Sequence, residues 1–366
     1  MSHRPVALLR WTAVTTSRFR ITIAIAVVAA VLAACSGSDD PTVDETIADT
    51  TTTTQPTEVV TDGRLTVGAL LPLTDTLLGE PMVAAVESAI DRINEAGGVL
   101  DRQVRLVVAD EGSSSASASA SIQTLLERDV DAVIGPASSL IALSTLDELV
   151  SAEKVVCSPT ASALSLDEFP DGDLFFRTIP SDSLQARAIA EAADQTGAQR
   201  VTIVYVDDSY GRPFADAVEA SLANEAISVV GRVPFSAADD DLSDQAGELA
   251  NSDTQVLILL AAGDDGTRFL EALDDEDTGG LATIVVNDAF RNPTSPQRIQ
   301  GLNDELRNKI VGLAPQADSG NDDEPFDSPG PFATNAYDCA NLIALAAVRA
   351  GTDSPRDIAR QIGQVS

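Results

Sequence analysis

From Arg64 onward, the chain alternates short runs of β-branched residues with amphipathic segments of helical length. This alternation is typical of a parallel sheet that is covered by helices on both faces. In the first half it predicts strands at residues 65–71, 104–109, 130–135 and 155–157, and helices at 81–96, 114–128 and 138–151. Gly97-Gly98 follows the first of these helices as a stop signal.

The same pattern resumes after residue 200. It predicts strands at 201–206, 227–233, 256–260 and 283–286, and helices at 212–224, 242–251, 266–273, 332–350 and 355–362. Two such series, joined through residues 175–183, predict an α/β fold of two doubly wound parallel-sheet lobes. Ligands of such sheets bind at the carboxyl ends of the strands, so we look for functional residues in the turns that follow strands.

Residues 1–34 have the pattern of an export signal. Arg10, Arg18 and Arg20 precede an apolar run at 21–32, which as a helix would rise about 18 Å, less than a ~30 Å bilayer core. The run ends LAACSG, which resembles the lipobox of bacterial lipoproteins, in which the cysteine becomes the lipidated N-terminus. We therefore expect lipidation at Cys35. The alternative is an ordinary cleavage site with an incidental cysteine.

Residues 35–63 are rich in Thr and Asp and almost free of large apolar side chains. Such a segment cannot bury enough surface to offset the entropy of ordering. It is predicted to be a disordered tether that spans roughly 30 Å as a random coil.

Composition excludes several classes of function. The chain has one histidine, His3, which lies in the predicted signal, so the exported protein would lack histidine-based catalytic and metal sites. With 23 Lys and Arg against 57 Asp and Glu, the net charge is −34, which disfavours binding to nucleic acid. No G-x-S-x-G, G-x-G-x-x-G or P-loop motif occurs where an α/β enzyme would need it. We expect no enzyme activity, no cofactor, no metal and no nucleic-acid partner.

Five blocks of sequence carry a family resemblance: the INEAGG stretch, GPASS, CSPTAS, FRTIPSD and DDSYGR, in that order. Together they resemble the branched-chain amino acid-type solute-binding proteins of ABC transporters, which are type I periplasmic binding proteins. The resemblance implies a first lobe of residues 64–180 plus 315–366 and a second lobe of 181–314. It implies hinge segments near 178–183 and 313–316.

Hydroxyl side chains follow two neighbouring strands of the first lobe. Ser138 and Ser139 open a helix after one strand, and Thr160 and Ser162 follow the next. A ligand carboxylate favours hydroxyl donors and a helix N-terminus. By resemblance, Ser138 or Ser139 contacts the carboxylate, Thr160 contributes its backbone, and Ser162 fills the family's Thr/Ser position. The alternative is that these serines are helix N-caps.

The second lobe supplies the remaining candidates. Asp288, after the strand at 283–286, matches the family's acidic position for the ligand's ammonium group, and Tyr210 matches an aromatic that closes over the ligand. The alternative for Asp288 is a solvated surface acid. Residues 261–265, AAGDD, stand where family members often carry an aromatic, so one wall of the site is smaller or more acidic here.

Two cysteines remain after Cys35. By the family's chain path, Cys157 and Cys339 both belong to the first lobe. A disulfide between them and a pair of buried free thiols both fit the sequence. The chain ends soon after the helix at 355–362, earlier than is usual in the family, which fits either a fragment or shortened final elements.

The resemblance implies an extracytoplasmic, lipid-anchored and monomeric protein. Its ligand, a small amino acid-like solute, would favour closure of the two lobes, and the closed form would be recognised by an ABC permease. Two alternatives remain open: binding of short amides or urea, and a sensor that signals to a receptor instead of feeding a transporter.

Overall fold

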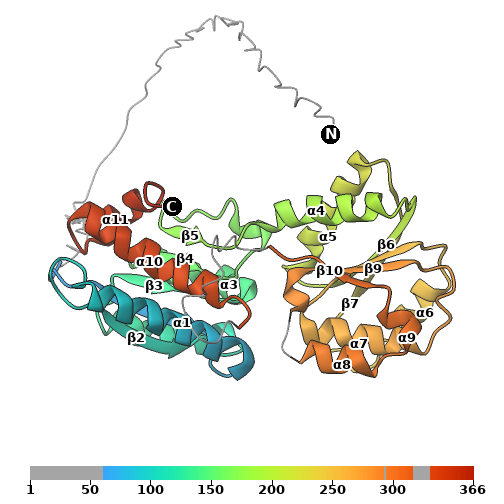
Figure 1. Ribbon diagram of the computed structural model, residues 1–366, viewed down its shortest axis with the longest axis horizontal. Helices are drawn as coiled ribbons and strands as arrows, with labels where there is room; N and C mark the ends of the chain where they lie inside the picture. Colours follow the sequence, from blue (N-terminus) through green and yellow to red (C-terminus); the bar gives the residue numbers. More distant parts are fainter. Residues whose placement is uncertain (1–60, 292–293, 316–329) are drawn as a thin grey trace, which may run out of the picture. The chain divides into compact units, whose positions relative to one another are not determined.

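The computed structural model of the protein describes residues 61–291, 294–315 and 330–366 (Figure 1). The predicted signal, Cys35 and most of the predicted tether lie outside these ranges. Within them, two parallel sheets of five strands each confirm the predicted α/β class with two lobes. No helix in the described ranges has both the length and the apolar character needed to cross a membrane.

The first sheet has the order β2-β1-β3-β4-β5. Its strands are β1 (Thr66–Leu71), β2 (Arg105–Asp110), β3 (Ala132–Ile134), β4 (Val155–Ser158) and β5 (Phe175–Arg177). The helices and the 3-10 turn that accompany it are α1 (Thr76–Glu95), α2 (Ser115–Leu126), α3 (Ser139–Ser151), η1 (Leu164–Leu166), α10 (Ala333–Ala350) and α11 (Pro355–Ile362).

The second sheet has the order β10-β9-β8-β6-β7. Its strands are β6 (Arg200–Val206), β7 (Ser228–Phe235), β8 (Val256–Leu260), β9 (Thr283–Val286) and β10 (Ile310–Gly312). Its helices and 3-10 turn are α4 (Asp182–Gln195), α5 (Gly211–Asn224), α6 (Ser243–Ala250), α7 (Gly263–Asp274), η2 (Asp288–Phe290), α8 (Ser295–Gly301) and α9 (Asp304–Arg307).

Each sheet is buried on both faces, because alternate residues of its strands enter different cores. In β1, Val67 and Ala69 pack with α1, α10 and α11, whereas Leu70 packs with α2 and α3. Figure 1 shows α10, from the end of the chain, beside α1, from its start, and both helices contribute to one core. The chain therefore returns to the first sheet after it has completed the second.

Several element boundaries differ from the sequence prediction. The first helix begins at Thr76 and not near Pro81, because the Asp75 side chain accepts a hydrogen bond from the Leu78 amide and caps the helix earlier. Pro81 consequently lies inside the helix. Similarly, α7 begins at Gly263 and takes in two acids that were predicted to lie in the preceding turn.

Besides the 3-10 turns η1 and η2, five strands and α-helices were not predicted: β5, α4, α8, α9 and β10. Of these, β5 and β10 are three residues long, and α9 is four, which is too short for a periodicity to show. The consequential omission is α4. It begins within the FRTIPSD block, at Asp182, directly after its N-cap Ser181.

Candidate functional site

The turn after β3 is built against the end of β1. Gly135 has a positive φ of 107°, and a Cβ atom there would lie 1.9 Å from the carbonyl oxygen of Leu70. Only glycine fits this position. The turn leads into α3, where the Ser138 hydroxyl accepts a hydrogen bond from the Ile141 amide at 3.4 Å as the N-cap. The capping interaction named as the alternative for Ser138 is thus present.

Hydroxyl groups at the end of β4 and just after it hold the same turn. Ser158 Oγ donates to the Pro136 carbonyl at 2.5 Å, and Thr160 Oγ1 donates to the Ala137 carbonyl at 2.6 Å. In return, Ser139 Oγ accepts a hydrogen bond from the Ala163 amide at 3.2 Å. The structure therefore brings Ser138, Ser139 and Thr160 together at the carboxyl edge of the first sheet.

A second group of polar side chains is buried around Tyr210. Ser162 and Asp288 are 5% and 4% exposed, and the hydroxyl groups of Ser162 and Tyr210 interact. Tyr210 Oη accepts a hydrogen bond from Asn287 Nδ2 at 3.1 Å, and its ring packs edge-on against Phe214. The same ring contacts apolar residues of both lobes. Three predicted ligand residues, Ser162, Tyr210 and Asp288, therefore share one buried site.

Helix α4 adds two residues that the sequence analysis did not select. Asp182 and Gln185 are 1% and 6% exposed and lie one helical turn apart. Neither carboxylate oxygen of Asp182 has a hydrogen-bond partner of good geometry among the described residues, although the Ser162 hydroxyl lies close enough to lower its pKa, and Gln185 Oε1 has no partner either. The amide of Asp182 is held by the Ser162 carbonyl at 3.0 Å. Three buried acceptor atoms therefore lack donors.

The acids of this site are held in an unfavourable environment for negative charge. Burial raises the pKa of Asp182 to about 7, and the nearby Asp288 raises it further, whereas the Ser162 hydroxyl and Arg177 oppose the rise. Burial also raises the pKa of Asp288, whereas a hydrogen bond from the Gln185 side chain lowers it. Burial, Asp182 and Asp288 raise the pKa of Tyr210 well above 10. A cation placed here would relieve this cost.

Neighbouring cations meet this demand only in part: the charges of Arg177 and Arg291 lower the pKa values of Asp182 and Asp288, respectively, yet burial still raises both. Arg177 pairs with Asp167 at 2.5 Å and directs its guanidinium to the carbonyl groups of Ala161 and Ala163. Asn287 is neutral: besides the bond to Tyr210, its Oδ1 accepts from the Ala261 amide at 3.2 Å and links the ends of β8 and β9. Nothing in the sequence distinguished Asp182 from other acids, because an acid in the first turn of a helix is usually solvated.

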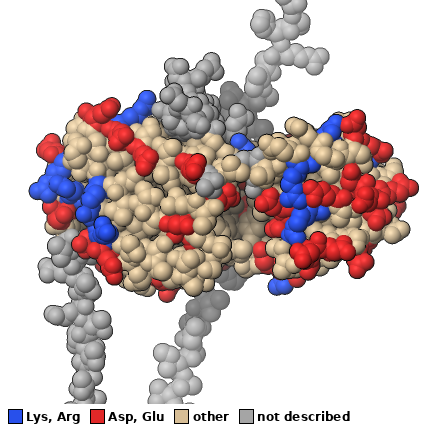
Figure 2. Space-filling view, turned by 90° about the horizontal axis from the view of Figure 1, so that it is seen from below, with Lys and Arg blue, Asp and Glu red and all other residues tan. Residues whose placement is uncertain are grey.

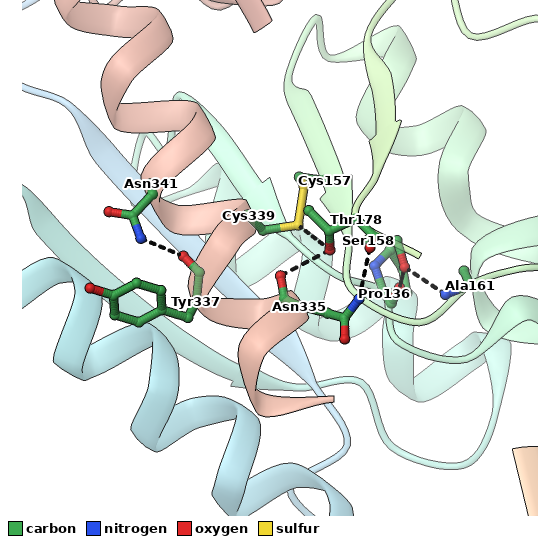
Figure 3. Close-up of a disulfide and its surroundings, with 9 residues drawn as sticks. All are labelled: Pro136, Cys157, Ser158, Ala161, Thr178, Asn335, Tyr337, Cys339 and Asn341. Atoms are coloured by element: carbon green, nitrogen blue, oxygen red, sulfur yellow. Dashed lines mark hydrogen bonds between the residues drawn. A yellow bond between two sulfur atoms is a disulfide. The ribbon is translucent and has the colours of Figure 1, made fainter. Parts of the chain in front are cut away.

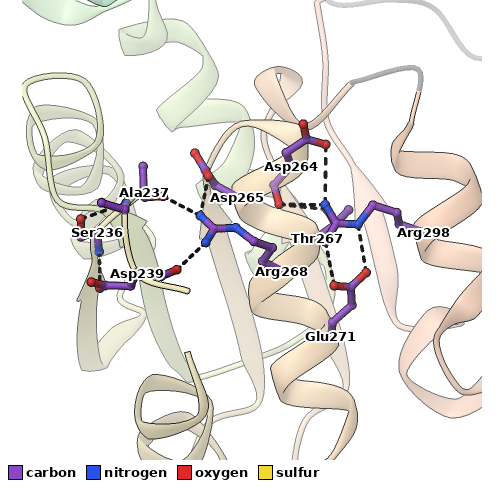
Figure 4. Close-up of polar contacts among 10 residues, drawn as sticks. Ser236, Ala237, Asp239, Asp264, Asp265, Thr267, Arg268, Glu271 and Arg298 are labelled. Atoms are coloured by element: carbon purple, nitrogen blue, oxygen red, sulfur yellow. Dashed lines mark hydrogen bonds and ion pairs between the residues drawn. The ribbon is translucent and has the colours of Figure 1, made fainter. Parts of the chain in front are cut away.

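The acids of the AAGDD segment are occupied elsewhere (Figure 4). Asp265 pairs with Arg268 at 2.8 Å, and Asp264 lies 3.6 Å from Arg298, which also pairs with Glu271 at 2.7 Å. Figure 4 shows Arg268 and Arg298 extending from α7 and α8 toward these carboxylates. The local acidity expected from the sequence is therefore largely balanced by arginine.

A disulfide joins Cys157 in β4 to Cys339 in α10, across 182 residues of sequence (Figure 3). Beside it, Thr178 Oγ1 donates to the Asn335 carbonyl at 2.9 Å, and Asn335 Nδ2 donates to the Thr178 carbonyl at 2.7 Å. Thr178 lies in the segment that leaves the first sheet after β5. These bonds attach that segment to α10, the helix that returns to the first sheet.

Acidic side chains are spread over the surface, and on the face in Figure 2 they are densest over the second lobe, where basic side chains lie among them. In the ranges that the structure describes, no group of three or more Asp, Glu, His or Cys side chains is arranged to hold a metal ion.

The sequence matches a family model described as periplasmic binding protein over residues 64–366. Among curated proteins, it is 27% identical over 315 residues to the chemotactic signal transduction system substrate-binding protein BasB of Halobacterium salinarum, covering 82% of this chain and 74% of that one. It is 26% identical to the Leu/Ile/Val-binding protein BraC3 of Rhizobium johnstonii, covering 62% of each chain.

Solved structures share the fold. An ABC transporter substrate-binding protein of Desulfitobacterium hafniense, in complex with Leu, matches with a TM-score of 0.64 and 24% identity over 83% of this chain and 89% of that chain. The leucine-binding protein LivK of Thermotoga maritima matches with a TM-score of 0.69 and 18% identity, and the match covers 81% of this chain and 87% of that chain. This chain belongs to the periplasmic binding protein family and has its type I fold, and the members of this family are ligand-binding proteins that act outside the cytoplasm.

Proposed function

We propose that this protein is the solute-binding component of an ABC importer and that it binds an amino acid of the branched-chain class. The observation that carries the proposal is the set of three buried, donorless acceptors on α4, at Asp182 and Gln185, beside Asp288. An alkylammonium group supplies three N–H donors and one positive charge. It would satisfy the acceptors and offset the buried negative charge together.

The remaining parts of an amino acid have complementary partners. In the proposed arrangement, the ammonium group faces Asp182 and Asp288, and Tyr210 covers it. The carboxylate faces the hydroxyl groups of Ser138, Ser139 and Ser162, which favour an anion, and the backbone at Thr160, whose own hydroxyl donates to the Ala137 carbonyl. A ligand that contacts both lobes shifts the population toward their closed arrangement, and no covalent bond changes.

Two observations support the branched-chain class. BraC3 is named for binding Leu, Ile and Val, and the similar D. hafniense protein is described in complex with Leu. A neutral amide or urea offers N–H donors but no charge, so it leaves the buried acids of α4 and η2 uncompensated. Amides and urea therefore fit this site less well than an amino acid.

A thermal-shift screen of L-leucine, L-isoleucine, L-valine, acetamide and urea tests the proposal. A ligand at 100 times its dissociation constant adds about 2.7 kcal/mol of stability. We expect a shift with the amino acids, and we expect Asp288→Ala to abolish it by removing the ammonium partner. Glu271→Ala, in an exposed ion pair of the same lobe, is the matched control and should leave the shift intact. A response to acetamide or urea alone would contradict the amino-acid assignment.

A sensor role is the second candidate, and the similarity to BasB favours it, because that relative is named for chemotactic signal transduction. Both roles use the same ligand site and differ in the membrane partner. Uptake of labelled leucine separates them. Deletion of the gene should abolish high-affinity uptake if the protein serves an importer, and should leave uptake intact but abolish the taxis response if it serves a receptor.

The proposed importer component is anchored to the cell membrane by lipid on Cys35, and residues 35–63 act as its tether. The proposal rests on the LAACSG motif and on the extracytoplasmic location of the family. Replacement of Cys35 by serine should move the protein from the membrane fraction to the soluble fraction after cell breakage. Retention of the Cys35→Ser variant in the membrane fraction would argue against lipidation.

A further inference from the structure

Glu111 follows β2 directly and is 2% exposed. Its amide donates to the Leu71 carbonyl at the end of β1, at 3.0 Å. Its side chain reaches beyond β1 to the turn after β3: Oε2 accepts from the Ala137 amide at 2.6 Å, and Oε1 accepts from the Ser138 amide at 3.2 Å. A residue of the β2 edge thus holds a turn two strands away.

The two amides that Glu111 occupies come immediately before the first helical residue of α3. Together with the bonds from Ser158 and Thr160 to the carbonyl groups of Pro136 and Ala137, they fix both sides of the Ala137 residue. Glu111 therefore restrains the segment from which Ser138 and Ser139 extend. It also takes up backbone donors that an incoming anion would otherwise use, which leaves the two serines as the turn's contribution.

We propose that Glu111 is a positioning residue of the ligand site, whose carboxylate sets the Gly135–Ser139 turn so that Ser138 and Ser139 meet the ligand's carboxylate. This inference rests on the proposed function. It does not require Glu111 to touch the ligand.

A carboxylate suits this task better than an amide. Its two oxygens both accept, so each can serve one backbone N–H, whereas glutamine presents one oxygen and an NH₂ group that donates. A Glu111→Gln side chain would keep the size and lose one of the two bonds. The charge also strengthens both bonds, since hydrogen bonds to an ionised acceptor are stronger than neutral ones.

The ionisable neighbour that acts on Glu111 is Asp110, the last residue of β2. Asp110 Oδ1 accepts from the amides of Leu73 and Gly112, each at 2.9 Å, so it holds the loop after β1. Burial, with a smaller contribution from Asp110, raises the pKa of Glu111 to about 7, against the two amide bonds. Protonation turns one acceptor oxygen into a hydroxyl, so the turn loses part of its support as the pH falls below about 7.

Asp131 provides a matched control for Glu111. It lies just before the start of β3, and the turn that Glu111 holds lies at the end of the same strand. Asp131 Oδ2 accepts from the Thr66 amide at 2.8 Å, and burial raises the pKa of Asp131 to about 7 as well. Asp131→Asn therefore removes a buried, amide-bound carboxylate from the first lobe without touching the turn after β3.

The experiment compares the full-length protein with its Glu111→Gln and Asp131→Asn variants in two measurements. Hydrogen exchange without ligand should become faster in residues 135–139 for Glu111→Gln only. Isothermal titration at pH 8 should show that Glu111→Gln weakens L-leucine binding about tenfold or more, the effect of a lost charge-assisted hydrogen bond, while Asp131→Asn stays within about twofold. L-leucinamide, which lacks the anionic carboxylate, should lose much less affinity than L-leucine.

Three outcomes would overturn the inference: unchanged exchange in residues 135–139, unchanged leucine affinity, or an equal loss for leucine and leucinamide. If the wild-type protein binds no amino acid, the proposed function fails, and the exchange measurement still shows whether Glu111 holds the turn. If Glu111→Gln does not fold, Glu111→Asp, which keeps the charge but is too short to reach both amides, is measured in the same way with the same expectation.

Discussion

The two lobes bring different kinds of polar group to the site. At the edge of the first sheet, Glu111, Ser158 and Thr160 all have hydrogen-bond partners within their own lobe. On α4, at the start of the second lobe, Asp182 has no partner for either carboxylate oxygen among the described residues. In the proposed site, the polar groups of the first lobe are thus already paired with one another, and the second lobe offers acceptors that a ligand would satisfy.

This difference has an energetic meaning. A buried polar group that is hydrogen-bonded costs little, whereas a buried carboxylate without a partner costs several kcal/mol. Folding tolerates the cost at Asp182 by raising its pKa to about 7, so that the carboxyl is partly protonated near neutral pH. A ligand that brings a cation recovers the cost as binding energy.

The largest expected effect is a loss of stability in the first lobe when its disulfide is removed. The Cys157–Cys339 disulfide closes a loop of 182 residues in sequence, and removing a disulfide of this kind costs about 2–5 kcal/mol. We expect the variant Cys157→Ala/Cys339→Ala to unfold at lower urea concentration and to bind L-leucine with an affinity close to that of the wild type. Both cysteines are at most 1% exposed, so alanine suits the site.

Equilibrium urea unfolding with isothermal titration on the same samples checks this prediction. Wild-type protein treated with a mild reductant under native conditions is the control, because the bridge is buried and should resist reduction. An unchanged unfolding midpoint in the double variant would show that the first lobe does not depend on the bridge.

A smaller change in stability is expected when Asp182 is replaced, and it is a gain instead of a loss. Its pKa is about 7 in the folded protein and about 3.8 when unperturbed, so the folded state binds more protons between these values. The stability contributed by the protonated carboxyl is therefore full below pH 3.8 and is lost as the pH rises through 7. Asp182→Asn removes this loss, so the variant should gain stability relative to the wild type at pH 8.

Ligand binding should show the opposite dependence on pH. An ammonium group prefers the ionised carboxylate, so the affinity of the wild type for L-leucine should rise between pH 5.5 and 8, and Asp182→Asn should weaken binding at pH 8 by about tenfold. Asp131→Asn should change the pH dependence of stability in the same direction without changing affinity. Equal affinity of Asp182→Asn and wild type at pH 8 would remove Asp182 from the ammonium site.

Much of the fold could be predicted because its signals are local. The alternation of buried strands and amphipathic helices depends on neighbouring residues, so β8, β9 and α11 begin and end at the predicted residues. The family resemblance pointed to Ser162, Tyr210 and Asp288, which the structure places in one buried group. Helix α4 was missed because no element was predicted between the connection at 175–183 and the strand at 201–206, and Asp182, which lies within that connection, was missed with it.

By itself, the sequence determined the class of the fold and restricted histidine to one position, His3, in the predicted signal, because periodicity and composition do not depend on which segments meet. The tertiary structure decided what each polar residue does. Asp182 resembles any other first-turn acid until packing removes water from it, and Glu111 resembles a loop acid until the order of the strands brings the turn after β3 within its reach. Burial and hydrogen-bond partners are set by residues distant in sequence, and only the folded chain brings them together.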